Sequence, residues 1–566
     1  MMLVAVAVIV LAAIALRLWG ISLESLDGDE VFSYRVVSSH FSAAMTTIRN
    51  DLVHPPLYYF LLRGWLDIAG HASPLALRAV SLISGISTVA LLACMGWMFP
   101  QIRTAALIAA GLLAANDLHI FYSQQARSYA FFAFVFTCLL TWSWQITRFM
   151  QQFAFWCCGV ILMSLLVYTH YVGSVYVACI IIAVTISPVP KRAKLRIWIA
   201  GFVAACSFIP WILAEIGPAR QHHGTEDNLS WESLPTVYDL KAIWASYLGI
   251  PAFHAATTCV FLIGCILVGF SIFHRRREQN RFRRVFLMTL AFTAFVPPCL
   301  LFVLSMKPIS LHIFGARHLL PSITSYLLLA ADGLVQISKY FRTRTIALSL
   351  GAAVLFALEL VPTAAATRSG PRRMPFRAIA SAAQGKLPIY TTWPYGIGAV
   401  MNFYEHDHSA VRSVPRDLNS LPDSFVLIFR PGIRKEEEEF ENLLKLRWQD
   451  ERNRDFYNGE RAGYYVRVAY LQRADLAGGG HAAHPLQILP KRTALQPDKA
   501  KERFTVDRVS RYSGIRLDSP AQIGGIPRLK AIAARRHPQK AEHQGCVSGT
   551  TAATEAGFDC SISGVA

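Results

Sequence analysis

ESLDGDEVFSYR, residues 24–35, and NDLVHPPLYYFLLRGW, residues 50–65, are the two halves of one polar loop in a strongly apolar chain. The loop follows the first apolar segment and brings together acidic residues, a histidine, a Pro-Pro pair and a run of aromatic residues. Aromatic rings are enriched where a membrane protein meets water. We therefore expect residues 21–74 to form an outer loop at a membrane surface.

The whole sequence has the composition of a membrane protein. It has 566 residues, of which 54% are hydrophobic and only 16% are charged, and its mean hydropathy is +0.36. A helix needs about 20 predominantly apolar residues to cross a bilayer with every backbone polar group bonded. Eleven segments are predicted to do so: 2–20, 75–99, 104–117, 129–149, 153–172, 174–190, 196–214, 253–273, 285–305, 319–338 and 345–364. The predicted fold is an all-α polytopic membrane domain over residues 1–365.

The basic residues are distributed as in a membrane protein with a cytoplasmic N-terminus. The formal net charge is +19, but the cations gather in short clusters between spans, at 191–196, 275–284 and 339–344. This positive-inside pattern sets orientation and requires no nucleic acid partner. We expect a multi-pass protein of a bacterial inner membrane, whose loop 21–74 and residues beyond 365 face the periplasm.

Two apolar segments allow another interpretation. The first twenty residues could be a signal peptide, but they lack a basic start and a small-x-small cleavage site, and more spans follow, so we interpret them as a span. Segment 54–74 is apolar for only about twelve residues before Arg63 and Asp67 interrupt it, which favours an interfacial or re-entrant helix. Treating it as a span would place the basic clusters on the outer side.

Beyond residue 365 the long apolar runs give way to short alternating elements. Helix-like and strand-like stretches alternate between 366 and 475, with LPIYTTW, SFVLIFR and GYYVRVAYL as the strands, which predicts a small extracytoplasmic α/β domain. Residues 476–566 are rich in Gly, Ala, Pro, His and Arg, and we expect a disordered basic tail there.

The acidic residues of the outer loop are the first candidates for chemistry. Glu24, Asp27, Asp29 and Glu30 fall within one short stretch directly after a span, and alone they are typical of a solvated loop. An acid held over the membrane surface could also deprotonate a hydroxyl beside a lipid-linked donor. The second half of the loop adds another acid, an imidazole and two phenols: Asp51, His54, Tyr58 and Tyr59.

The sequence also carries a series of short motifs in a fixed order. They are Asp29-Glu30, HPPLYYFLLRGW, SPLALRAVS at 73–81, HIFYSQQARSYA at 119–130, YTHY at 168–171, FIPW at 208–211 and ARHLLPSI at 316–323. In this order the chain resembles bacterial relatives of the protein mannosyltransferases that use dolichyl-phosphate mannose, and of the aminoarabinose transferases, within the C-type membrane glycosyltransferase fold. The resemblance covers about the first 330 residues.

The resemblance implies transfer of a sugar from a polyprenyl-phosphate carrier to an envelope lipid, polysaccharide or protein on the extracytoplasmic face. The family's catalytic acid maps onto Asp29, with Glu30 beside it, and the residue that approaches the carrier phosphate maps onto His54. The family places an acid in the second outer loop, where this chain has QQARS at residues 124–128. Asp51 or Asp117 are alternatives for that second acid.

Cations and histidines of the other outer loops are candidates to bind the carrier phosphate. Arg127 and Arg317 lie at span ends, where an arginine is either a snorkelling anchor or an anion ligand. His170 lies at the outer end of a span, where a polar residue more often caps a helix than binds a substrate, and His318 follows Arg317 directly.

The sequence predicts no cofactor or metal site. No GxGxxG or Walker motif precedes a strand-to-helix turn, which agrees with a lipid-carried donor. His222, His223, Glu226 and Asp227 match no familiar ligand spacing, and a requirement for a divalent metal stays open. The alternatives are an O-antigen or oligosaccharide ligase and a flippase or transporter of lipid-linked sugars, which would typically place charges at mid-membrane.

Overall fold

The computed structural model describes residues 2–221, 234–247, 281–368 and most of 374–474. By its internal contacts the chain divides into two units, Met1–Ile515 and Arg516–Ala566, and every described residue belongs to the first. The predicted span 253–273, His222, His223, Glu226, Asp227 and the predicted tail 476–566 lie outside the described residues.

Each predicted span within the described chain coincides with a helix. These helices are α1 (Met2–Leu18), α5 (Pro74–Met98), α6 (Arg103–Ala115), α8 (Tyr129–Ser143), α10 (Phe153–Thr169), α11 (Gly173–Ile186), α12 (Lys191–Gln221), α16 (Arg281–Ser305), α17 (Leu320–Ser338) and α18 (Arg344–Arg368). Within the described residues, four are long and apolar enough to cross a membrane: α5, α12, α16, and α17 with the short turn before it. A fifth candidate is α6 with α7 (Asp117–Ser123), a pair bent by 63°.

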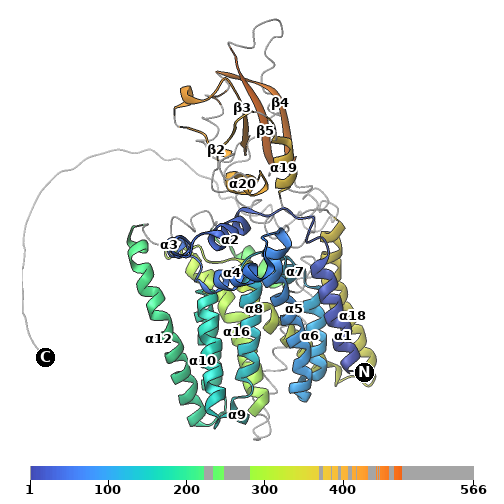
Figure 1. The fold of residues 1–566 in the computed structure, drawn as a ribbon. Helices are drawn as coiled ribbons and strands as arrows, with labels where there is room; N and C mark the ends of the chain where they lie inside the picture. Colours follow the sequence, from blue (N-terminus) through green and yellow to red (C-terminus); the bar gives the residue numbers. More distant parts are fainter. Residues whose placement is uncertain are drawn as a thin grey trace, which may run out of the picture. The chain divides into compact units, whose positions relative to one another are not determined.

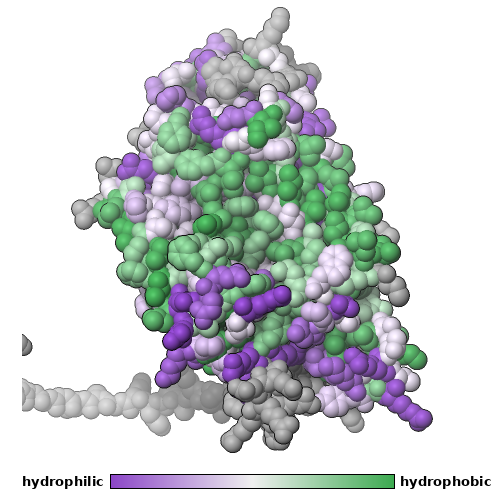
Figure 2. Space-filling view, turned by 60° about the horizontal axis from the view of Figure 1, so that its bottom comes forward, coloured by the Kyte–Doolittle hydropathy of each residue, from purple (hydrophilic) through white to green (hydrophobic). Residues whose placement is uncertain are grey.

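The outer surface of the helical part is apolar. Large hydrophobic side chains are exposed on several helices, among them Leu11 of α1, Phe153 of α10, Phe202 of α12 and Leu350 of α18. Figure 2 shows a band of apolar side chains across the visible face, with hydrophilic side chains gathered toward its ends. Such a surface is stable only in contact with lipid or an equivalent apolar medium, so the predicted helical membrane architecture is confirmed.

Small residues bring the helices into close contact. Ala105, Ala106, Ala109 and Ala110 of α6 are all buried in the main core cluster. At Gly111 of α6, the neighbouring helix α18 comes so close that an added Cβ would overlap the ring of Phe356. Without water to drive helix association inside a bilayer, close packing of this kind supplies much of the stability.

The predicted outer loop folds into three short helices. They are α2 (Gly28–Ser38), α3 (Phe41–Asp51) and α4 (Leu57–Ala69), and Figure 1 shows them lying across the ends of the longer helices. The 13 residues of α4 are too few to cross a bilayer, and the helix buries Tyr58, Tyr59 and Leu62 on one side.

The basic turns lie at the opposite ends of the long helices. Because the helices alternate in direction, the turns after α5, α8, α11 and α17 fall at one end, where Figure 1 shows the short helix α9 (Ile146–Phe149). Arg103, Arg148, Lys191 and Lys339 belong to these turns. One set of helix ends therefore carries these basic turns, and the other carries the loop helices.

The residues after α18 form a small α/β part, as predicted. Its sheet has the order β2-β1-β3-β5-β4, from Val411–Ser413, Ile389–Thr391, Ser424–Phe429, Tyr465–Arg473 and Trp448–Tyr457. β1 pairs in parallel with β2 and β3, and the other pairs are antiparallel. Helices α19 (Phe376–Ala383) and α20 (Ala399–Glu405) share a core cluster with α2, α3 and α4. Strands β2 and β4 were not predicted, and the boundary at residue 366 stays a prediction.

Gly111→Val should lower the melting temperature of the full-length protein in detergent, because the added methyl groups meet Phe356 and overpacking typically costs about 1–3 kcal/mol. Gly64→Ala is the matched control, since a Cβ at Gly64 of α4 has open space around it. Equal melting temperatures for the two variants would contradict the close contact between α6 and α18.

Candidate active site

The start of α2 fixes the two adjacent acids of the loop. Asp27 is the N-cap: its side chain accepts a hydrogen bond from the Glu30 N–H at 2.9 Å, and the Glu30 carboxylate accepts one from the Asp27 N–H at 3.3 Å. This reciprocal capping box places Asp29 and Glu30 in the first helical turn, where the helix dipole favours negative charge. The sequence DGDE therefore starts a helix, and its second and third carboxylates, those of Asp29 and Glu30, point in different directions.

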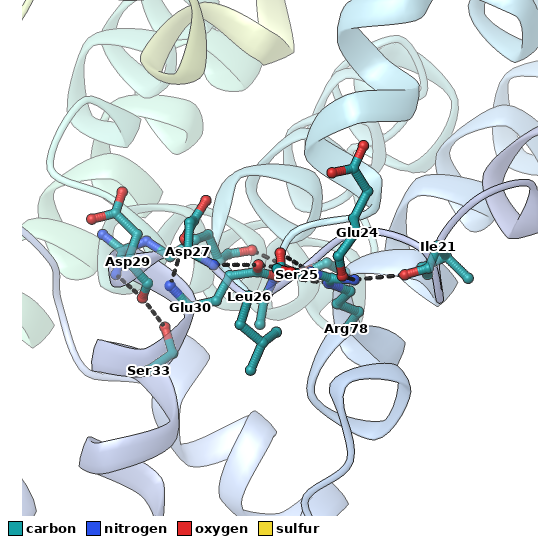
Figure 3. Close-up of polar contacts among 12 residues, drawn as sticks. Ile21, Glu24, Ser25, Leu26, Asp27, Asp29, Glu30, Ser33 and Arg78 are labelled. Carbon is teal, nitrogen blue, oxygen red and sulfur yellow. Dashed lines mark hydrogen bonds and ion pairs between the residues drawn. The ribbon is translucent and has the colours of Figure 1, made fainter. Parts of the chain in front are cut away.

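Glu30 points inward, to a completely buried ion pair with Arg78 of α5 (Figure 3). The Arg78 Nε and Nη2 donate to the two carboxylate oxygens at 2.8 and 2.9 Å. The other guanidinium donors bond the backbone oxygens of Ile21, Glu24 and Ser25. Glu30 also accepts the Ala126 N–H at 2.9 Å, which ties the second outer loop to the first. With these bonds, Glu30 has the contacts of a positioning residue.

Asp29 points outward. Its side chain is exposed, and in Figure 3 its carboxylate points away from Arg78. The Asp29 backbone oxygen accepts a hydrogen bond from Arg127 Nη1 at 3.3 Å, and the Asp29 charge acts on His54. Of the two adjacent acids, Asp29 is the one that an incoming acceptor can reach.

His54 joins Asp51 to Arg127. The His54 Nδ1 lies 2.8 Å from the Asp51 carboxylate, and its Nε2 lies 3.0 Å from Arg127 Nη2. These partners fix a neutral tautomer: Nδ1–H donates to Asp51, and the Nε2 lone pair accepts from the guanidinium. Burial and the charge of Arg127 lower the pKa of His54, and Asp51 opposes that shift.

Arg127 is buried, and one of its N–H groups has no hydrogen-bond acceptor within the described structure. The residue is only 5% exposed, and the N–H group in question is that of Nε. The rings of Phe32 and Tyr129 lie close by, each with its centroid 6.0 Å from the guanidinium carbon. A buried, unsatisfied N–H on a charged group is costly, so this arrangement favours an anion.

The backbone of Arg127 is held by a short chain of hydroxyl groups. Tyr58 Oη bonds Ser81 Oγ at 2.8 Å, and Ser81 Oγ donates to the Arg127 backbone oxygen at 2.8 Å. Tyr59 packs edge-on against Phe32, with ring centroids 6.1 Å apart. The two adjacent tyrosines of α4 therefore support the site without entering it.

Two more histidines extend the cluster. The His170 ring is 5.9 Å from the His54 ring and stacks on Phe132. Since His170 Nδ1 accepts the Val172 N–H, its Nε2–H donates to His318 Nδ1 at 2.9 Å. Arg317 Nε lies 3.1 Å from His318 Nε2. The structure thus brings Arg127, Arg317, His54, His170 and His318 together from four separate loops.

Asp117 lies in different surroundings. It begins α7 beside Asn116, whose amide donates to the Glu359 carboxylate of α18 at 3.0 Å. Arg17 of α1 lies near the same bend and donates to the backbone oxygens of Leu113 and Ala114. These contacts brace the bend between α6 and α7, whereas Asp51 lies directly on His54.

Sequence reasoning did not single out Arg78 or the aromatic walls. Arg78 stands in the SPLALRAVS motif, and an arginine near the start of an apolar helix is itself a signal for a buried partner. Among the described residues, no group of three or more His, Cys, Asp or Glu side chains is placed to hold a metal ion.

A scan against protein-family models finds no match, and a search of curated proteins finds none. Among solved structures, the chain is similar to ArnT from Cupriavidus metallidurans, both in the apo state and bound to undecaprenyl phosphate. Each match has 12% identity and a TM-score of 0.49, and covers 84% of this chain and 99% of ArnT. The Archaeoglobus fulgidus oligosaccharyltransferase in complex with Zn and sulfate matches with 13% identity and a TM-score of 0.48, over 72% of this chain and 62% of that one.

At identities this low, the comparison describes the fold and leaves the chemistry to the residues of this chain.

Glu30→Gln should destabilise the protein by about 3–5 kcal/mol, because it leaves the buried Arg78 charge without its counter-ion. Thermal unfolding of the purified protein measures this loss. Asp29→Asn is the matched control: it changes the neighbouring, exposed carboxylate in the same way and should leave the melting temperature unchanged. Equal effects of the two substitutions would contradict the division between an inward and an outward acid.

The stability contributed by His54 should depend on pH. Because the folded state lowers the pKa of His54, the contribution is complete above the ordinary value of about 6.5 and is lost as the pH falls below it. The difference in melting temperature between the wild type and His54→Asn should therefore shrink from pH 7.5 to pH 5. A difference that grows as the pH falls would contradict the neutral tautomer, because a protonated His54 would be stabilised by Asp51.

Proposed function

We propose that the protein is an integral-membrane glycosyltransferase that moves a sugar from a polyprenyl-phosphate carrier to an envelope acceptor. The observation that carries the proposal is the exposed Asp29 carboxylate beside the buried side chains of Arg127, His54, His170 and His318, with the half-buried Arg317 next to His318. A base next to a desolvated anion site is what displacement of a sugar phosphate requires. The cluster lies at the ends of apolar helices, where a lipid phosphate would be found.

In the proposed reaction, the acceptor hydroxyl attacks the anomeric carbon of the donor sugar. The new bond joins the acceptor oxygen to that carbon, the bond to the phosphate oxygen breaks, and Asp29 takes the hydroxyl proton. Negative charge gathers on the leaving polyprenyl phosphate. The Arg127 Nε–H is the available donor in the buried cluster, Arg317 adds further N–H groups and positive charge, and neutral His54 holds the Arg127 guanidinium in place. A single displacement inverts the anomeric carbon.

Glu30 and Asp51 take supporting roles in this proposal. Glu30 fixes both loops through Arg78 and the Ala126 N–H, and Asp51 sets the tautomer of His54. The second outer loop, where related enzymes carry a second acid, has the sequence QQARS at residues 124–128 in this chain and holds no acid there. In this proposal, Asp29 alone accepts the proton of the acceptor hydroxyl.

The proposed location is a bacterial inner membrane, with the N-terminus in the cytoplasm and the active site on the periplasmic side. The separation of basic turns from the loop helices supports this orientation, because basic residues prefer the cytoplasmic side.

Asp29→Asn should lower the turnover number by about 10²- to 10⁴-fold, the usual contribution of a general base. The readout is mass spectrometry of envelope glycolipids and glycans from a deletion strain complemented with each variant. Asp67→Asn, an exposed acid on α4 of the same loop, is the matched control and should restore the glycan. Full complementation by Asp29→Asn, or a deletion strain with an unchanged set of glycans, would overturn the proposal.

Arg127→Gln separates donor binding from base catalysis. It removes the spare Nε–H and the charge while Ser81 still holds the backbone of the loop, so binding of undecaprenyl phosphate should weaken roughly tenfold or more. Asp29→Asn should bind the same lipid at least as well as the wild type.

A further inference from the structure

A second site lies on another face of α2. A cleft of about 490 Å³ opens between α2, α20 and β2, a size common for small-molecule sites. It is lined by Val31, Tyr34, Arg35, Ser38, Ser39, Ala399, Asn402, Phe403, Val411 and Ser413.

The cleft and the active-site cluster use different faces of the same helix. Val31, Tyr34, Arg35 and Ser38 follow the spacing i, i+3, i+4, i+7 and so share one face of α2. Phe32 stands on a different face, where it packs against Tyr59 and Arg127. The cleft is therefore not part of the site described above.

The lining combines a cation, rings and small polar groups. Arg35 is the only charged residue among the lining residues, and its exposed guanidinium has no hydrogen bond or ion pair within the described structure. Tyr34 and Phe403 pack edge-on at 5.0 Å and form an aromatic wall. Serine hydroxyls and the Asn402 amide complete the surface.

This chemistry suits a saccharide with an acidic group. The C–H face of a sugar ring is apolar and packs on aromatic rings, its hydroxyls bond serine and amide groups, and a carboxylate or phosphate pairs with a guanidinium. None of the described residues that line the cleft is acidic, so none of them repels such a group.

We propose that this cleft binds an acidic saccharide unit of the acceptor, away from the hydroxyl that reacts. The inference rests on the proposed glycosyltransferase function. Arg35 follows Asp29 by six residues, which is roughly 9 Å along the helix axis, and faces another direction. The acceptor is therefore an oligosaccharide or glycolipid that extends past a single sugar, with its acidic unit held in the cleft while its reacting unit meets Asp29.

The test is binding of two soluble probes to the full-length protein in lipid nanodiscs, trigalacturonic acid and the neutral maltotriose. The wild type should bind trigalacturonic acid more tightly than maltotriose. Arg35→Ala should weaken trigalacturonic acid binding about tenfold, which corresponds to the loss of one charge-assisted pair. Ser38→Trp should also block binding, because it fills the cleft and leaves Arg35 in place.

Arg412→Ala is the matched control. Arg412 lies between the cleft residues Val411 and Ser413 on β2, so strand alternation directs it to the other face of the sheet, and its removal should leave binding unchanged. Asp29→Asn should also keep binding, which separates this test from the test of catalysis. Equal binding of the probes to the wild type, or undiminished binding by Arg35→Ala, overturns the cleft proposal and leaves the role of Asp29 unaffected.

Discussion

The buried pair of Glu30 and Arg78 is the interaction on which the outer loops depend. A guanidinium with no access to water requires an acceptor for each of its donors, and Arg78 finds them in one carboxylate and three backbone oxygens of residues 21–25. The same carboxylate accepts the Ala126 N–H. One ion pair therefore sets the path of the chain after α1, the start of α2 and the position of the loop that carries Arg127.

Two adjacent acids thereby acquire opposite properties. Glu30 is buried and its carboxylate is fully hydrogen-bonded, whereas Asp29 is exposed and lies beside a cluster of imidazole and guanidinium groups. Enzymes commonly assign different tasks to neighbouring carboxylates through their surroundings. In the cluster beside Asp29, His54 is neutral and the arginines are cationic, so the cluster offers hydrogen bonds and positive charge in a site with little water to screen them.

Hydropathy predicted the helices because lipid offers no hydrogen-bond partners to the backbone N–H and C=O groups. A long apolar helix satisfies these groups internally, so an apolar run of sufficient length predicts a helix. It could not predict strands β2 and β4. β2 has three residues, and β4, WQDERNRDFY, is as polar as a loop. The resemblance assigned the catalytic acid to Asp29 rather than to Glu30, but the physical difference between the two acids, the burial of Glu30 against Arg78, is visible only in the structure. Asp117 was considered as the second acid because the sequence does not show that Glu359 of α18 lies at the same bend, bonded to Asn116.

The outer loop is also held from the far end of the chain. The Leu26 N–H donates to Tyr404 Oη at 2.8 Å, and Ser25 Oγ accepts the Arg377 N–H at 3.2 Å. These partners are separated by 378 and 352 residues. During synthesis, which adds about 5–20 residues per second, the acidic loop is thus translated tens of seconds before its last supports exist. The acidic loop is among the first segments made and among the last to receive all its contacts, so a chain interrupted before residue 377 lacks two hydrogen bonds that hold this loop.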